Sequence, residues 1–235
     1  MKLKNKVAII TGSSDGIGKQ IALRLAEEEV EIALVARSEK RLEQVKSECE
    51  QLGSPKVKYY ICDLKDKERI GSAVESIKND FGKINILINN AGIWQKMMDL
   101  DEIHPETIEE VIATNLTAVI HVTQSTLPIL REEEDAAIIN ISSKSGVTAQ
   151  KGQSVYTASK WGVKGFTDVL KEDLKDTNVR VGAVYQSGTN TKMFEKTEEE
   201  VPIDKFTDPA DLADVVKYML LRPEKIWIHE VHVTY

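Results

Sequence analysis

The stretch "VAIITGSSDGIG", residues 7–18, places a short apolar run before a turn that contains three glycines. The run has the length of a buried strand, and Ile17, Ile21 and Leu25 follow the turn at helical spacing. Glycines let a backbone approach a pyrophosphate, and the start of a helix offers free N–H groups. The stretch therefore predicts the first strand, turn and helix of a dinucleotide-binding domain. Its expected contacts are Gly12, Ser13, Ser14, Asp15, Gly16, Ile17 and Gly18, although the charge of Asp15 would repel phosphate if it pointed inward.

Apolar runs of strand length alternate with amphipathic helical segments along the rest of the chain. The runs cover 7–10, 31–36, 57–61, 84–89, 136–141, 179–184 and 230–233. They are continuously apolar, as expected for a parallel sheet with both faces covered. Because the composition does not change along the chain, we expect one α/β domain over residues 1–235. The predicted fold is a Rossmann fold, with a doubly wound parallel sheet of about seven strands and helices on both faces.

The composition argues against several classes of protein. The 235 residues carry a net charge of −7, which disfavours nucleic-acid partners and anionic membrane surfaces. The two cysteines form neither a disulfide framework nor a metal cluster, and we expect no metal. No apolar run reaches the roughly 18 residues of a membrane span, and the first strand begins too early for a signal peptide. These features predict a cytoplasmic protein.

Polar residues follow several of the predicted strands, where ligands bind in open parallel sheets. Arg37 and Ser38 follow the second run, at a position where NAD-preferring sites usually carry an acid. An arginine can pair with a 2′-phosphate, so NADP(H) is favoured over NAD(H); a solvated surface arginine is the alternative. Asp63 and Leu64 follow the third run, and the carboxylate either accepts from an adenine amine or caps the next helix. The fourth run ends in a turn of small and polar residues that would pass close to a flat group: Asn89, Asn90, Ala91 and Gly92.

Tyr156 and Lys160 lie four residues apart at the start of a helical segment, and so on one face of it. A buried tyrosine beside a lysine that reaches solvent is the ordinary interpretation. The alternative is a tuned acid, since a useful catalytic pKa lies near 7 and free tyrosine titrates near 10. That shift needs roughly 4 kcal/mol, about what a positive charge roughly 4 Å away supplies at an effective dielectric near 20.

Two further sites carry polar residues in unusual places. Asn115 interrupts an apolar helical stripe, and its amide must be satisfied by backbone, water or a reaction path. Ser142 and Ser143 follow the fifth run, where serines are usually turn formers. A serine hydrolase is disfavoured, because His104, His121, His229 and His232 show no arrangement that suggests a general base.

Taken together, "TGSSDGIG", "NNAG", Asn115, "ISSKSG" and "YTASK" resemble, in this order, the motifs of the short-chain dehydrogenase/reductase family. Tyr156 lies 13 residues after Ser143, a separation typical of that family, so Ser143 is preferred over Ser142. The resemblance implies hydride transfer between a nicotinamide and a carbonyl or alcohol carbon of a small molecule. It also implies that Tyr156 exchanges the proton, Ser143 binds the reacting oxygen, and Lys160 holds the nicotinamide ribose and lowers the tyrosine pKa. Asn115 would complete a water-linked relay to Lys160.

The chain departs from the family pattern after the sixth run. Gln186 and Ser187 stand where the family usually has Pro-Gly, and Thr189 replaces a valine, whereas Thr191 is retained. Thr189 and Thr191 are both expected to contact the cofactor, Thr191 through the carboxamide. Gln-Ser allows a different backbone path from Pro-Gly. A catalytically weak or inactive dinucleotide-binding regulator or scaffold is therefore the alternative function.

The resemblance also implies how the protein binds substrate and assembles. The variable loop over 192–206 is short, which favours small or openly bound substrates. Members of the family commonly pair through two long helices, so a homodimer or homotetramer is expected, with Trp161 and Phe166 as candidate contacts.

Overall fold

The strands of the computed structural model form where the apolar runs predict them. Seven strands make one parallel sheet in the order β3-β2-β1-β4-β5-β6-β7, which confirms the predicted fold class. They are β1 (Val7–Thr11), β2 (Glu31–Ala36), β3 (Val57–Ile61), β4 (Ile86–Asn89), β5 (Ala136–Ser143), β6 (Val179–Gln186) and β7 (Glu230–Val233). The structure describes residues 1–195, 199, 201–223 and 225–234. Strands β5 and β6 each extend two residues beyond the predicted runs, and these residues reach the site described below.

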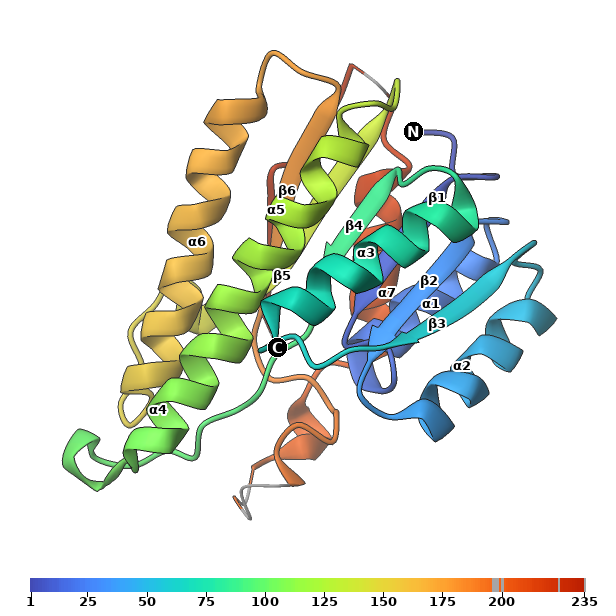
Figure 1. Cartoon of the computed structure of the whole chain (residues 1–235). Coiled ribbons are helices and arrows are strands. Elements are labelled where there is room, and N and C mark those ends of the chain that lie inside the picture. The colour runs from blue at the N-terminus through green and yellow to red at the C-terminus, as the bar shows by residue number, and fades with distance from the viewer. Residues whose placement is uncertain (196–198, 200, 224, 235) are drawn as a thin grey trace.

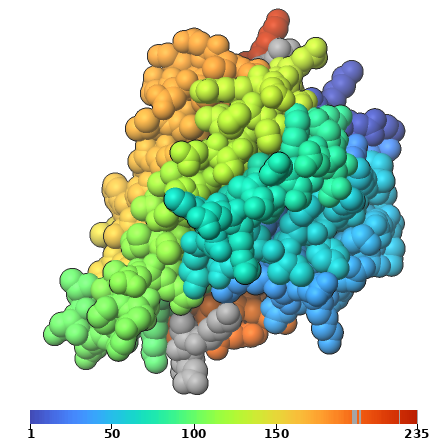
Figure 2. All heavy atoms as spheres, in the orientation of Figure 1, coloured from blue at the N-terminus to red at the C-terminus, as the bar shows by residue number. Residues whose placement is uncertain are grey.

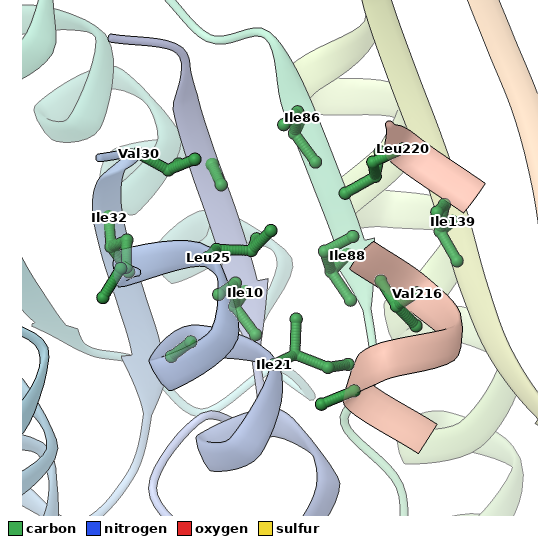
Figure 3. Packing of buried hydrophobic residues seen from close by; sticks show 14 of the residues in the cluster. Ile10, Ile21, Leu25, Val30, Ile32, Ile86, Ile88, Ile139, Val216 and Leu220 are labelled. Carbon is green, nitrogen blue, oxygen red and sulfur yellow. The ribbon is translucent and has the colours of Figure 1, made fainter. Parts of the chain in front are cut away.

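Helices cover both faces of the sheet (Figure 1). One face carries α1 (Gly16–Ala26), α2 (Glu39–Gln51) and α7 (Pro209–Leu220), and the other carries α3 (Lys67–Phe81), α5 (Ala118–Leu130) and α6 (Ser154–Leu174). In Figure 2, α3 and α5 hide the sheet from the viewer. Figure 3 shows Ile21 and Leu25 of α1 with Val216 and Leu220 of α7, packed against strand isoleucines such as Ile88. No helix in the described part of the chain is long and apolar enough to cross a membrane.

The strand order reverses between β1 and β4, where ligands of doubly wound sheets bind. The glycine turn follows β1, and the turn at 90–92 follows β4. Helix α4 (Pro105–Ile112) continues through a π-helical turn, Ala113–Thr117, into α5. The segment between β6 and α7, orange in Figure 1, lies beyond the carboxyl ends of the strands. Within the predicted loop at 192–206, residues 196–198 and 200 lie outside the described residues.

Candidate active site

The glycine turn is held tightly against the turn that follows β4. Gly12 and Gly16 have φ values of +66° and +54°, which only glycine adopts without strain. A Cβ on Gly18 would lie 2.4 Å from the Asn90 Nδ2 and 2.5 Å from the Gly12 carbonyl oxygen. The Asn90 Nδ2 donates to the Thr11 carbonyl oxygen at 2.9 Å, which fixes one turn to the other. The two turns therefore form a rigid base for a ligand at the point where the strand order reverses.

A cavity of about 520 Å³ runs from this base past the ends of β2 and β3 to the start of α6. Its volume falls in the range of ligand sites, roughly 300–1,000 Å³. Most of the predicted binding residues line it: Gly12, Ser14, Asp15, Gly16, Ile17, Arg37, Ser38, Asp63, Leu64, Asn90, Ala91, Gly92, Tyr156, Lys160 and Thr191. The structure thus brings together residues from six separate segments of the chain.

Four of the predicted cofactor-binding residues do not line this cavity. Ser13 is fully buried, and Gly18 supports the turn from beneath. The Asn89 Nδ2 donates to the Thr123 Oγ1 and the Asn140 Oδ1, each at 2.9 Å, because the side chain points into the interior. Thr189 is buried beside a second cavity instead. The strand-end positions alone could not distinguish residues on the wall of this cavity from residues behind it.

Asp15 does not leave an uncompensated negative charge in the glycine turn. Its Oδ1 accepts from the Gly16 N–H at 2.8 Å, capping α1, and its Oδ2 lies 3.3 Å from the Arg41 Nη1. The Lys192 Nζ lies 3.9 Å away on the other side. Sequence reasoning missed Arg41, which also lines the cavity. Arg41 lies in the first turn of α2, three residues after the N-cap Ser38, and its contact with the glycine turn is one that no local pattern indicates.

Asp63 does not cap the helix that follows it, contrary to one of its two predicted roles. The N-cap of α3 is Asp66, whose carboxylate accepts from the backbone N–H groups of Glu68 and Arg69. The Asp63 Oδ1 instead accepts from the Lys65 N–H at 3.1 Å, which stabilises the turn before the helix. Asp63 is therefore left on the cavity wall, where its carboxylate is available to a ligand.

Tyr156 and Lys160 lie at the far end of the cavity on the inner face of α6. Both are buried, and the Lys160 Nζ lies 5.7 Å from the centre of the Tyr156 ring. The pKa of Tyr156 is raised to about 12, because the effect of burial exceeds the opposite effect of its hydrogen bond with Ser143. Burial also lowers the pKa of Lys160 to about 8. Burial and the Ser143 hydrogen bond are the causes of the tyrosine shift here, and the lowering of the tyrosine pKa by Lys160 stays a prediction for the protein with a nicotinamide bound.

The Lys160 ammonium makes no hydrogen bond or ion pair with any residue in the described ranges. A buried cation is costly unless it is paired, so this group points to a ligand with acceptor oxygens. Gly92 lines the cavity beside it, where a Cβ would lie 3.6 Å from the Lys160 Nζ and 3.3 Å from the Asn115 Oδ1. A larger residue at this position would crowd the groups beside it.

Asn115 is satisfied by the backbone that follows β4. Its Oδ1 accepts from the Ile93 N–H at 2.8 Å, and its Nδ2 donates to the Ile93 carbonyl oxygen at 2.9 Å. The Nδ2 also lies 3.3 Å from the Ser159 Oγ, which in turn donates to the Tyr156 carbonyl oxygen. The π-helical turn at Ala113–Thr117 places this side chain against both segments. Asn115 therefore connects the turn after β4 to the first turn of α6.

Ser143 is the last residue of β5 and faces a second cavity, of about 380 Å³, next to the first. Its hydroxyl hydrogen-bonds Tyr156 and accepts from the Ser145 N–H at 3.1 Å. Ser142 lines the first cavity instead. Sequence reasoning missed Gln95, which is 1% exposed and whose Oε1 accepts from the Tyr156 N–H at 3.1 Å. Gln95 thus caps the start of α6 from a distant segment, a contact that no local pattern indicates.

The residues present fit a nicotinamide dinucleotide. A glycine cradle stands at one end of the cavity, arginines stand along its side, and a buried lysine without a partner in the described ranges stands beside a tyrosine at the other end. With the parallel sheet and its switch point, this arrangement defines an oxidoreductase of the dinucleotide-binding α/β class.

Comparison with known proteins identifies the family. A model of the short chain dehydrogenase family matches residues 6–202, and the chain belongs to the short-chain dehydrogenase/reductase family. It is 34% identical to the 3-oxoacyl-(acyl-carrier-protein) reductase FabG of Thermotoga maritima, over 93% of this chain and 92% of that protein. It is 33% identical to an uncharacterized oxidoreductase of Staphylococcus epidermidis, over 99% and 98% of the two chains.

Two solved structures resemble the whole chain. A metagenomic short-chain oxidoreductase in complex with NADP has 29% identity and a TM-score of 0.86, with both chains covered in full. An alcohol dehydrogenase from the archaeon Thermococcus sibiricus, complexed with 5-hydroxy-NADP, has 25% identity and a TM-score of 0.90, over 97% of this chain and 96% of that one. The chain is therefore an oxidoreductase of this family that binds NAD(P).

Proposed function

We propose that this protein is an NADP(H)-dependent oxidoreductase that transfers a hydride between the nicotinamide and a carbonyl or secondary alcohol carbon of a small molecule. The observation that carries the proposal is the buried Lys160 ammonium, which has no partner in the described residues and lies one helical turn from Tyr156. Arg37 and Arg41 on the cavity wall support NADP(H) over NAD(H), and the NADP complexes of similar structures add to this.

The roles of the residues follow from their geometry. A reduced nicotinamide bound beside Lys160 supplies the hydride. Ser143 holds the substrate oxygen, and Tyr156 donates a proton to that oxygen as negative charge develops on it. With a pKa of about 12, Tyr156 is protonated at neutral pH, which is the form that donates a proton in the reduction of a carbonyl. Lys160 binds the ribose and, with a pKa of about 8, is largely protonated at pH 7.

Asn115 acts in this proposal as a positioning residue. Its amide holds the turn after β4 against the first turn of α6, and so fixes the space between Gly92 and Lys160. A water-linked relay from Asn115 to Lys160 is part of the same proposal. Assembly into a homodimer or homotetramer is also proposed; Trp161 is 48% exposed on α6, whereas Phe166 packs against the core.

A fluorescence titration with NADPH and NADH tests the cofactor part of the proposal. The Trp94 ring lies 4.7 Å from the Tyr156 ring, next to the cavity, so energy transfer from tryptophan to a bound nicotinamide is expected. We expect NADPH to bind in the micromolar range and more tightly than NADH. The variant Trp94→Phe should lose most of the transfer and keep the affinity. Absence of binding by either dinucleotide would contradict the proposal.

A panel of small carbonyl compounds, followed by oxidation of NADPH, tests the reaction. Tight binding of NADPH with no turnover of any carbonyl would favour the alternative, a dinucleotide-binding regulator or scaffold. Turnover of at least one ketone or aldehyde would exclude it.

A further inference from the structure

Gln186 is the last residue of β6 and the direct neighbour of Ser143. The register of β5 and β6 pairs Ser143 with Gln186. Paired residues on adjacent parallel strands lie about 4.8 Å apart and point to the same face of the sheet. The Gln186 side chain therefore stands beside the hydroxyl that is proposed to hold the reacting oxygen. It also lines both the first and the second cavity, at the junction where substrate and nicotinamide would meet.

The orientation of the Gln186 amide is set by Thr189. The Thr189 Oγ1 donates to the Gln186 Oε1 at 2.6 Å, which leaves the Nε2 as a donor with no partner among the described residues. The next residue, Ser187, has a shielded Oγ that also lacks a partner in the described part of the chain, and it lines the second cavity. A shielded polar group without a partner is destabilising, and a hydrogen bond to a ligand oxygen offsets that cost.

Another part of the wall of the second cavity is apolar and aromatic. The Trp94 ring lies 4.7 Å from the Tyr156 ring and 5.3 Å from the Phe194 ring, and Phe194 lies 5.6 Å from Phe206. Met97 and Met193 line the same space. Aromatic rings at these distances favour edge and offset contacts with another flat ring. The cavity therefore combines a wall suited to a ring with donor groups next to the reacting oxygen.

We propose that the substrate is a ring-bearing ketone with a second carbonyl oxygen one or two carbon atoms from the reacting carbon, and that the Gln186 Nε2 binds this second oxygen. The inference rests on the proposed function, because Ser143 and Tyr156 must hold the reacting oxygen. From there, the spacing of β5 and β6 brings a neighbouring oxygen to Gln186. The ring lies against Trp94 and Phe194.

The test compares substrates that differ in the second oxygen. The probes are 1-phenyl-1,2-propanedione and ethyl benzoylacetate, with propiophenone as the matched mono-ketone, each reduced with NADPH. The variants are Gln186→Leu, which keeps the approximate size and removes the donor, and Thr189→Val, which removes the group that orients the amide. For Gln186→Leu we expect kcat/KM to fall about 10-fold with at least one dicarbonyl and to stay within about twofold with propiophenone. Thr189→Val should show the same selectivity with a smaller loss.

A titration of Gln186→Leu with NADPH separates a substrate contact from a cofactor contact. We expect the Kd for NADPH to stay within about twofold of the unsubstituted protein. The inference would be overturned if kcat/KM fell equally with all three ketones or with none of them. It would also be overturned if a weaker affinity for NADPH accounted for the whole effect. If propiophenone or another mono-ketone is reduced but Gln186→Leu shows no selectivity, the inference fails and the proposed function stands. If the unsubstituted protein reduces no carbonyl at all, both fail.

Discussion

The two ends of the first cavity differ in how far their ionisable side chains are exposed to water. At the glycine turn, the side chains of Asp15 and Arg41 are 37% and 55% exposed, and they pair with each other. At the start of α6, Tyr156 and Lys160 are only 4% and 5% exposed, and burial shifts the pKa values of both. Water screens the first pair and is excluded from the second.

This difference in exposure predicts that the two ends control different properties. The arginines affect the preference between NADPH and NADH, and the residues of α6 affect the rate of the reaction. An exposed ion pair is worth about 1 kcal/mol or less and weakens as salt is added. A buried titratable group has a shifted pKa, and a tenfold change in its acid dissociation constant corresponds to about 1.36 kcal/mol. We therefore expect large, salt-independent effects from substitutions at α6, and small, salt-sensitive effects from substitutions of the arginines.

The largest effect is expected at Tyr156. The variant Tyr156→Phe removes the proton donor and leaves the ring that packs against Trp94. Since a positioned general acid contributes about 10²–10⁴-fold, NADPH-dependent ketone reduction should fall about 10³-fold, while the Kd for NADPH stays within a few-fold. Steady-state rates and the fluorescence titration measure the two quantities. Activity within a few-fold of the unsubstituted protein would remove Tyr156 from the mechanism.

Lys160 should make folding stability depend on pH. Its pKa is lowered from 10.5 in the unfolded chain to about 8 in the folded one. Between these values the unfolded chain binds the proton and the folded chain does not, so the free energy of unfolding rises with pH through this window. The contribution of Lys160 is about 3 kcal/mol across it. Urea unfolding at pH 7.5 and pH 10 measures the change.

The matched variant for this measurement is Lys160→Met, which keeps the length of the side chain and removes its charge. It should unfold with a higher free energy than the unsubstituted protein at pH 7.5, and the two should converge toward pH 10. Tyr156, whose pKa is raised, acts in the opposite direction and only above pH 10. If the free energies of unfolding of the two proteins differed by the same amount at pH 7.5 and pH 10, Lys160 would stay protonated in the folded protein over this range.

Local spacing in the sequence was enough to predict some parts of the site but not others. The continuous apolar runs predicted all seven strands, and the four-residue spacing placed Tyr156 and Lys160 on one face of α6. The sequence assigned a possible N-cap role to Asp63, whereas the N-cap of α3 is Asp66. Both aspartates precede α3, and which one caps it depends on where the first turn of the helix begins. The partner of Asn115 is Ile93, which is far away in the sequence. The pairing of Ser143 with Gln186 required the strand register, which no single segment encodes.

The smallest effects are expected at the arginines. Because Arg37 has no ion-pair partner among the described residues, Arg37→Gln should lower the preference for NADPH over NADH about 10-fold at low salt. Arg41→Gln should lower it less, since the charge of Arg41 is shared with Asp15. Both losses should shrink as ionic strength rises from about 0.02 M to 0.5 M, because the 2′-phosphate would be bound at an exposed site. Arg24→Gln, which breaks an ion pair with Asp214 at a residue that does not line the cavity, is the control and should leave the preference unchanged. If the preference for NADPH were lost to the same extent at high salt, the bound cofactor itself would bury the charges of the arginines. The difference in exposure between the two ends of the cavity would then disappear when NADPH binds.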